Sequence, residues 1–455
     1  MKNLSLKILL SALLLSAIQS LQAQNDIAFY SLGDATPQSL SLNAAFHPNS
    51  RFYISLPVIS GFHIGVNNGF SYSDLFQKVP GEDAVTVEGD KFLKNLKNRS
   101  YLNMTSNISL LQAGVTLPAV GSFSFFVNER ISGGFTYPKK TFEFIWEGNG
   151  AFVDQDFVED ETRVQFNHFR EFGLGFAKSF NISDRPLTAG IRLKMLQGIF
   201  NAESDKDFEL NIATQQDRFF LDITTQNPEF RTAGFDVFDN GDEGSYIAGN
   251  ANKGFAVDLG GTYSVNENID VSLAINDLGS ITWKEHVKNY TVTNTSITFE
   301  GLDISDLEDF GEALIDTLES KFNDETNTES YTSGISPRSF VGGSYLLGNN
   351  RLSLTLSNYF QAGRTQTGIG AAYTRKFGPI KVSGTLSKLP QQIISVGGAF
   401  SLDLGAYQMY FASDNLFGLS DLTKTQNASF RFGMNLVFGS SKEPKSKKSD
   451  VEIKI

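Results

Sequence analysis

A period of two in the apolar residues runs through most of this sequence, and it restricts the fold more than any other feature. Such alternation gives a β-strand one apolar face and one polar face. The apolar positions of five clear segments are Phe172, Leu174 and Phe176; Leu187, Ala189, Ile191, Leu193 and Met195; Phe255, Val257, Leu259 and Tyr263; Leu352, Leu354 and Leu356; and Ile380, Val382 and Leu386. The residues between them are mainly Gly, Ser, Thr and Ala with a few charges, whereas the solvent face of a soluble sandwich is usually charged. We therefore predict membrane strands that face lipid on one side and a lumen on the other.

The composition fits a membrane barrel better than a bundle of membrane helices. The 455 residues include 40 Phe and 41 Gly, yet the mean hydropathy is only −0.16. In a barrel only alternate residues contact lipid, so a polar average is expected. The chain has no cysteine, which argues against disulfide frameworks and against a lipid-anchored lipoprotein. A net charge of −12 argues against nucleic acid as a partner and indicates acidic external loops or an acidic docking surface.

The N-terminus has the pattern of a secretory signal. Lys2 and Lys7 supply the positive region, and the segment Ile8–Ile18 is an apolar core of export length. Ala23 offers a small residue at the cleavage site, so we expect residues 1–23 to be a signal peptide. This apolar run is too short for a membrane-spanning helix, which needs about 20 apolar residues.

Loop lengths predict the orientation in the membrane. Short turns are expected at 118–121, 181–186, 265–268, 348–350, 377–379 and 401–403, and long connections at 72–99, 137–162, 201–252 and 294–335. Outer-membrane barrels have short periplasmic turns and long external loops. The long connections are therefore assigned to the cell exterior.

About fifteen alternating segments lie between residues 51 and 438. With both chain ends in the periplasm the strand number must be even, and Phe52–Val58 is the weakest strand because Pro57 interrupts it. We therefore predict an all-β protein, a transmembrane antiparallel β-barrel of about 14 strands over residues 59–438. Residues 24–58 are predicted to be an N-terminal segment or plug at the periplasmic mouth.

Two further segments fall outside the strand pattern. Ser305 and Glu308 form a capping box, and apolar residues follow at helical spacing up to Phe322, which predicts one helix in an external loop. This helix packs on the barrel rim or binds a partner. Residues 439–455 are predicted to be a charged periplasmic tail.

The last strand of the predicted barrel has an aromatic, strongly amphipathic pattern. Its outward positions are Phe430, Phe432, Met434, Leu436 and Phe438. This pattern resembles the signal that the barrel assembly machinery recognises at the end of outer-membrane proteins. We therefore expect the assembly machinery and outer-membrane lipid as partners, and the cell outer membrane as the location.

Five segments carry a family resemblance: Ser41–Phe46, Asn252–Gly260, Leu278–Lys284, Gln408–Asn415 and Arg431–Gly439. They resemble a Bacteroidota family of outer-membrane β-barrels known only as a domain of unknown function. That family is distantly similar to long-chain fatty acid transporter barrels, which have an Asn-Pro-Ala turn near their start, and to the shuttle barrel of type IX secretion. Ala44 stands where those barrels have the proline. The resemblance implies the fold and the membrane and does not imply a substrate.

Charged residues of both signs lie on the predicted lumen face: Glu171, Arg192, Lys194, Asp258, Lys381 and Arg431. Opposite charges that face each other inside a narrow barrel pair and fill the interior. This pattern disfavours an open porin and predicts a lumen that is closed to ions at rest.

The segment Asp277-Leu278-Gly279 breaks the alternation between Ile275 and Ile281. Strict alternation would point Asp277 at lipid, whereas a bulge at Asp277 and Gly279 would turn the carboxylate inward and kink the wall. In barrels similar to the fatty acid transporters such a kink forms a lateral opening. A bulge with a purely structural role is the alternative.

Nothing in the sequence indicates an enzyme, a cofactor or a metal site. The four histidines, His47, His63, His168 and His286, have neither metal-ligand spacing nor a nucleophile elbow nearby. The acidic stretch Asp236–Glu243 carries the oxygen ligands that calcium prefers but lacks EF-hand spacing, so a solvated loop is the other interpretation.

Two functions remain open at this point. The first is gated passage or uptake of a small molecule, which the transporter resemblance suggests is hydrophobic. The second is a structural or accessory barrel in a surface-protein secretion or assembly complex.

Overall fold

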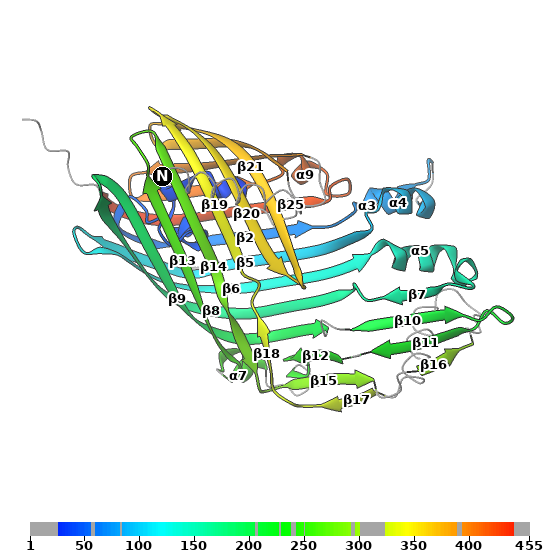
Figure 1. Cartoon of the computed structure of the whole chain (residues 1–455). Coiled ribbons are helices and arrows are strands. Elements are labelled where there is room, and N and C mark those ends of the chain that lie inside the picture. The colour runs from blue at the N-terminus through cyan, green and yellow to red at the C-terminus, as the bar shows by residue number, and fades with distance from the viewer. Residues whose placement is uncertain are drawn as a thin grey trace, which may run out of the picture.

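The computed structural model describes residues 26–55, 60–81, 84–204, 208–226, 229–237, 243–249, 251–292, 296–300, 324–388 and 394–440. Their strands form one closed antiparallel β-barrel of 14 strands, which confirms the predicted fold class and strand number (Figure 1). The signal peptide, the helix expected at Ser305–Phe322 and most of the charged tail lie outside the described residues.

The wall strands follow one another around the barrel in chain order, and two of the fourteen are each made of two pieces, β1 with β2 and β18 with β19. They are β1 (Ser50–Ser55) with β2 (Gly61–Asn67), β5 (Arg99–Leu117), β6 (Gly121–Pro138), β8 (Arg163–Ile182), β9 (Arg185–Ser204), β13 (Lys253–Ser264), β14 (Ile269–Trp283), β18 (Tyr331–Gly334) with β19 (Arg338–Leu347), β20 (Asn350–Gln361), β21 (Arg364–Phe377), β22 (Ile380–Lys388), β23 (Ser395–Leu404), β24 (Tyr407–Ser413) and β25 (Asn427–Ser440).

The first wall strand corrects one predicted boundary. We expected residues 24–58 to lie outside the wall, because Pro57 weakens that segment as a strand. Instead β1 pairs with β25 on one side and with β5 on the other, and β2 continues between the same two neighbours. Pro57 falls between the two halves, in residues that the structure does not describe, so it does not remove either half from the ladder. The N-terminal segment therefore ends before Ser50, and β1 with β2 closes the barrel.

Short turns gather at one end of the barrel and longer elements at the other (Figure 1). The last short turn lies at Gly405-Ala406 rather than at 401–403, because β23 runs on to Leu404. One connection at the opposite end, Ala362-Gly363 between β20 and β21, is also short. By the loop-length rule the end with the longer elements faces the cell exterior.

The external loops have structure of their own. The four-stranded sheet consists of β7 (Asp156–Glu159), β10 (Glu209–Thr214), β11 (Leu221–Gln226) and β16 (Ser296–Phe299), and the wall is extended by β12 (Glu229–Ala233), β15 (Val287–Val292) and β17 (Asp324–Asn327). A hairpin is formed by β3 (Phe76–Lys78) and β4 (Val85–Val87). The short helices are α3 (Tyr72–Leu75), α4 (Gly89–Asn95), α5 (Lys139–Glu147), η3 (Asn149–Phe152), α7 (Glu243–Ala248) and α9 (Leu416–Ser420). The four-stranded sheet packs around Phe157, Ile212, Ile223 and Ile297.

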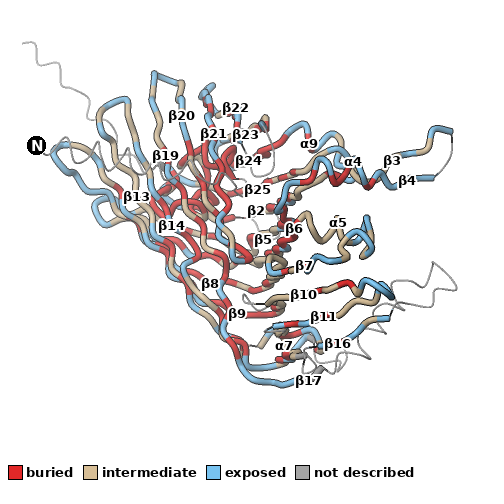
Figure 2. Tube along the Cα trace, turned by 45° about the vertical axis from the view of Figure 1, so that its right-hand side comes forward, coloured by how far each residue is buried: buried red, intermediate tan, exposed pale blue. Residues whose placement is uncertain are grey.

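Alternation along the wall separates a lumen face from a lipid face. Leu174 is 64% exposed on the outside of β8, while its neighbours Gly173 and Gly175 are buried. Exposed residues gather at the ends of the hairpins, and buried residues line the wall strands (Figure 2). Among the described residues, no helix is long and apolar enough to span a membrane. On β25 the five predicted outward residues, from Phe430 to Phe438, are half-buried or exposed, and Arg431 and Asn435 between them are buried.

Candidate functional site

The lumen contains residues 26–49, which we call the plug. The plug is built from α2 (Ile27–Tyr30), η1 (Gly33–Ala35) and η2 (Pro37–Ser41). Its aromatic side chains pack on wall residues: Phe29 stacks on Tyr410 with ring centroids 5.0 Å apart, and Tyr30 stacks on Phe340 at 5.0 Å. The helices of the plug are too short to be stable alone, so this packing must hold them.

Side chains from several wall strands donate hydrogen bonds to backbone carbonyls of the plug. The pairs are Gln112 to Pro37 at 2.9 Å, Arg192 to Leu40 at 3.1 Å, Asn276 to Leu42 at 2.9 Å, Lys381 to Leu32 at 3.0 Å and Gln408 to Ala35 at 2.9 Å. The donors belong to β5, β9, β14, β22 and β24, so the plug is held from several sides of the barrel. None of these contacts is covalent, so the plug is joined covalently to the wall only where it continues into β1 at Ser50.

Two glycines let the plug backbone approach the wall closely. Gly190 of β9 and Gly260 of β13 are cross-strand partners, and the plug turn at Asn43–Ala45 lies against both. A Cβ at Gly260 would come within 2.1 Å of the Asn43 side-chain oxygen, and a Cβ at Gly190 within 2.1 Å of the Ala44 carbonyl oxygen. This turn belongs to the segment Ser41–Phe46 that carried part of the family resemblance.

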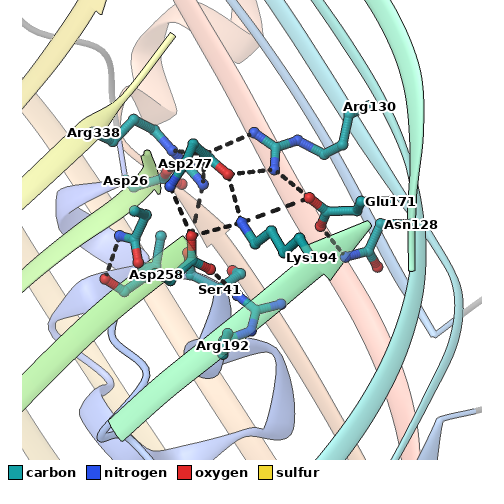
Figure 3. Close-up of polar contacts among 12 residues, drawn as sticks. Asp26, Ser41, Asn128, Arg130, Glu171, Arg192, Lys194, Asp258, Asp277 and Arg338 are labelled. Carbon is teal, nitrogen blue, oxygen red and sulfur yellow. Dashed lines mark hydrogen bonds and ion pairs between the residues drawn. The ribbon is translucent and has the colours of Figure 1, made fainter. Parts of the chain in front are cut away.

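Above the plug turn, charges of both signs that are buried or, for Arg130, half-buried form a network that we call the ion cluster (Figure 3). Its members are Asp26, Arg130, Glu171, Arg192, Lys194, Asp258, Asp277, Arg338 and Arg431. Lys194 lies at the centre: its Nζ is 2.7 Å from Asp258 Oδ1, 2.5 Å from Asp277 Oδ1 and 3.6 Å from Glu171 Oε2. Charges this deeply buried require partners, and each acid here has at least two basic neighbours.

Asp26 joins the plug to this cluster. Arg431 on β25 reaches its Oδ1 at 2.5 Å, and Arg338 on β19 reaches its Oδ2 at 3.4 Å. Burial by itself raises the pKa of the Asp26 carboxyl, but the charges of Arg431 and Arg338 outweigh burial and hold the pKa below its ordinary value of 3.8. Asp26 is therefore an ionised latch between the plug and two wall strands on different sides of the lumen.

The structure places a bulge at Asp277. On β14, Asn276 and Asp277 lie opposite the single residue Asp258 of β13, Asp277 has a φ of +63°, and its backbone N–H donates to Asp258 Oδ1 at 2.7 Å. The bulge turns the Asp277 carboxylate into the ion cluster. It also reverses the faces of the strand: Ile275 is exposed on the outside, whereas Ile281 is fully buried. Gly279 lies against Phe255 and Ala256 with no room for a side chain.

The bulge coincides with a break in the wall. β14 pairs with β19 as far as Asn276↔Arg338 and resumes with β18 at Ser280↔Gly334. Between these rungs, residues 277–279 and 335–337 share only one long hydrogen bond, from the Ile335 N–H to the Gly279 carbonyl at 3.4 Å. Pro337 has no N–H to donate. We call this interruption the wall break.

Behind the wall break, a cluster of apolar side chains lines part of the lumen. The members of this apolar lumen cluster are Phe169, Leu196, Ala233, Ala256, Ile281, Trp283, Val287, Tyr331 and Ile335. Ile335 belongs both to the cluster and to the wall break. The lumen therefore changes from charged at the ion cluster to mainly apolar next to it, where buried Asn201 and Ser333 hydrogen-bond to Tyr331 and Trp283 of the cluster.

The external part of the lumen is closed by contact between opposite walls. Asn103 on β5 donates to Gln366 on β21, and the Ala362 N–H donates to Gln165 on β8 at 2.8 Å. The Gln361 side chain lies against Gly134 on β6, where a Cβ would come within 2.9 Å of it. At the periplasmic end a pocket of about 190 Å³ remains between the plug and the wall, lined in part by Tyr30, Phe46 and Arg351.

Four of the six predicted lumen charges, Glu171, Arg192, Lys194 and Asp258, meet in the ion cluster, and Arg431 joins them through Asp26. Lys381 does not, since it binds the plug nearer the periplasm.

The sequence interpretation missed three members of the ion cluster. Arg130 follows Glu129, and that adjacent opposite charge obscured the alternation; continuing the pattern forward from the apolar position Phe125 would have placed Arg130 inside. Arg338 was missed because it begins a strand directly after Pro337, and Asp26 was missed because it lies in a segment without periodicity.

The histidines are separate from one another. His63 lies 4.0 Å from Asp26, His168 pairs with Glu129, and His286 Nδ1 lies 3.0 Å from Asp236. Within the described ranges, no group of three or more His, Asp or Glu residues could hold a metal ion. Residues 238–242 of the proposed calcium loop fall outside those ranges.

A closed 14-strand barrel with a lipid-facing outer surface is the architecture of bacterial outer-membrane proteins, and this one has an occluded lumen. The chain belongs to the Family of unknown function (DUF5723), whose model matches residues 45–414. No curated protein sequence matches the chain.

Several solved barrels have a similar fold. The toluene transporter TbuX of Ralstonia pickettii is 12% identical, with a TM-score of 0.37 over 89% of this chain and 94% of that one. A FadL homologue of Pseudomonas aeruginosa is 10% identical, with a TM-score of 0.39 over 93% and 96%. The outer membrane phospholipase OMPLA of Salmonella typhi, an enzyme, is 9% identical, with a TM-score of 0.21 over 84% and 92%. Similarity at this level concerns the fold and not the function.

Proposed function

We propose that this protein passes small, largely apolar molecules across the outer membrane and that the plug closes it at rest. The observation that carries the proposal is the wall break with the apolar lumen cluster directly behind it. An apolar molecule dissolves in the lipid around the barrel, so a route through the wall suits it better than a water-filled axial pore.

The obstruction of the axial route also favours an apolar substrate. The plug and the ion cluster fill the lumen, and opposite walls touch on the external side. A water-soluble solute would need both closures to open. A molecule that enters at the wall break would reach the apolar lumen cluster without crossing the external closure. It would then need the plug to move and would have to pass the wall residues of the ion cluster.

Uptake of an apolar dye tests the proposal. We expect cells that express the barrel to take up N-phenyl-1-naphthylamine, and cysteines replacing Leu278 and Ile335 would allow the wall break to be closed with a bifunctional maleimide. The parent has no cysteine, so the cross-link is specific. We expect cross-linking to reduce dye uptake to the level of cells without the barrel. A second cysteine pair, which replaces Leu193 and Leu259 on paired strands away from the wall break, is the control. Unchanged uptake after cross-linking at the break would refute the lateral route.

Planar-bilayer conductance tests the closed lumen. The intact barrel should be silent, and removal of residues 26–49 should produce conductance if the external contacts alone cannot exclude ions. Silence of both proteins would assign ion exclusion to the external closure. Steady porin-like conductance of the intact protein would contradict the resting closure and make general diffusion the simplest function.

An accessory role is the second candidate, and the external four-stranded sheet with its own apolar core favours it. Such a sheet offers a folded surface to a secretion or surface-assembly partner. A stoichiometric partner purified from native membranes, together with normal dye exclusion, would support this role over passage.

A further inference from the structure

A small charged group lies on the outside of the barrel, among lipid-facing residues. Glu129 of β6 and Arg170 of β8 are cross-strand partners, and Arg170 Nε donates to Glu129 Oε2 at 2.8 Å. His168, two positions along β8, brings its Nε2 to 2.7 Å from Glu129 Oε1. We call Glu129, His168 and Arg170 the outer triad.

Alternation fixes the side of the wall on which the outer triad lies. On β6, Arg130 points into the lumen and pairs with Glu171, so its neighbour Glu129 points outward. On β8, Glu171 points inward, so Arg170 points outward, on the same face as the exposed Leu174. The ion pair between Glu129 and Arg170 therefore lies on the outside of the wall, and the ion pair between Arg130 and Glu171 lies on the inside.

The height of Arg170 on the wall corresponds to the external membrane boundary. Arg170 and Ile182, the last residue of β8, are twelve positions apart. A strand that rises about 3.3 Å per residue and tilts by about 40° climbs about 2.5 Å per residue, which puts Arg170 about 30 Å above the periplasmic turn. The apolar band of an outer-membrane barrel is about 25 Å tall. The outer triad therefore lies at the level of the external lipid head groups.

Arg170 has an edge that no protein group occupies. Both oxygens of Glu129 are taken, one by His168 and one by Arg170 Nε. Within the part of the chain that the structure describes, neither terminal nitrogen of Arg170 has a hydrogen-bond or ion-pair partner, and its side chain is 25% exposed. An exposed ion pair contributes at most about 1 kcal/mol, so stability alone gives little reason for these charges beside lipid.

Aromatic rings continue the surface on the external side of the outer triad. The rings of His168 and Phe200 are 5.5 Å apart, Phe200 and Phe235 are 5.5 Å apart, and Phe166 lies 6.4 Å from Phe235. Rings at this height match the aromatic girdle of membrane barrels.

We propose that the outer triad binds a phosphate group of a glycolipid in the outer leaflet. The two terminal nitrogens of Arg170 form the planar edge that recognises phosphate oxygens in pairs. Glu129 acts as a positioning residue, because it holds the Nε edge of Arg170 and leaves the other edge free. The phenyl rings pack on the apolar part of the same lipid.

Native mass spectrometry of the mature barrel, extracted with its own lipids in a mild detergent, tests this site. Arg170→Gln should lower the fraction of barrels that retain phosphorylated glycolipid about tenfold, since it removes a bidentate charged hydrogen bond. Lys178→Gln is the matched control, because Lys178 is an outward cation near the periplasmic end of the same strand, with its Nζ 5.7 Å from the Phe180 ring. Equal retention in wild type and Arg170→Gln, or an equal loss in both variants, would overturn the proposal.

Three further measurements keep the test decisive. Arg170→Lys preserves the charge and should still lower retention, so the proposal remains testable if Arg170→Gln fails to assemble. Glycolipid from which phosphate has been removed should not be retained by wild type. If an excess of inorganic phosphate fully displaces the glycolipid, the site takes small anions and the lipid assignment is wrong. If Arg170→Gln instead converts a dimer to a monomer without changing retention, the outer triad is an interface between copies, which also overturns the proposal.

Discussion

The latch at Asp26 leads to a prediction whose size can be worked from the structure. Asp26→Asn keeps the shape of the side chain and removes its charge, which leaves the buried guanidinium of Arg431 without its acid partner. Removing one member of a buried ion pair costs about 3–5 kcal/mol, and an asparagine oxygen that still accepts a hydrogen bond puts the cost near about 3 kcal/mol. Each 1.4 kcal/mol is tenfold, so the ratio of seated to released plug should fall by about two orders of magnitude.

Thiol labelling measures this ratio directly, because the natural chain has no cysteine. Thr36 in the plug is fully buried, so the thiol of a Thr36→Cys variant reacts with a soluble maleimide only after the plug leaves its seat. When the plug reseats faster than the reagent reacts, the labelling rate is proportional to the released population. We expect Asp26→Asn, added to the Thr36→Cys background, to raise the labelling rate of this thiol about a hundredfold.

Asp34→Asn in the same background is the control for charge in the plug. The Asp34 side chain is 42% exposed and lies 3.9 Å from Lys381, so its removal should change the labelling rate by less than about fivefold. A labelling rate that Asp26→Asn leaves unchanged would refute the latch. Equal acceleration by Asp26→Asn and Asp34→Asn would show that the plug responds to its net charge and not to the pairing of Asp26.

Four more predictions concern the same molecule. Gly260→Ala should also accelerate labelling of the plug thiol, because its Cβ would collide with Asn43, whereas Gly261→Ala, which faces open space apart from one atom 3.9 Å away, should not. The pKa of Asp26 is depressed in the folded state, so the latch is intact above about pH 4, near the ordinary pKa of 3.8. Because maleimide reacts with the thiolate and slows in acid for every variant, the measurement is a ratio: the excess of the Asp26→Asn labelling rate over the parent rate should shrink as pH falls below that value. Lys194→Met removes the central cation from three buried carboxylates and should lower the free energy of unfolding by about 3–5 kcal/mol in a urea titration of the barrel, and an unchanged midpoint would contradict the pairing. Replacing Phe432 and Phe438 with Asp should reduce the amount of assembled barrel in the membrane, as each carboxylate faces lipid, while deletion after Ser440 should leave assembly unchanged.

The wall could be predicted from the sequence because its pattern is local. Alternation identifies a strand from a few neighbouring residues, and closure follows because unpaired strand edges are not tolerated in lipid. The same alternation predicted a possible bulge at Asp277, since an aspartate among lipid-facing residues is costly. The local pattern gave the wrong prediction at Phe52–Val58, because Pro57 led us to place this segment outside the wall although β1 belongs to it.

The seat of the plug could not be predicted, because it depends on contacts between residues far apart in the chain. Asp26 and Arg431 are 405 positions apart, and no periodicity links them. The close approach of the plug to Gly190 and Gly260 could not be predicted either, because glycines are frequent among the lumen-facing residues of this barrel. The external closure at Gln361 depends on which strands lie opposite across the lumen, and that follows only from the complete ring.

The ion cluster contains pairs within the wall and pairs between the wall and the plug, and this difference explains how the plug can move while the wall stays folded. Lys194 pairs with acids that all belong to the wall, and these pairs hold the bulge of β14 in place whether or not the plug is seated. Asp26 is the one acid that the plug contributes to the cluster, and among the described residues it is the only acid within ion-pair distance of Arg431. Arg338 keeps Asp277 as a partner after the plug leaves. Within the ion cluster, release therefore leaves only Arg431 without an acid partner, which is the arrangement that a reversible closure needs and that a permanently filled barrel would not require.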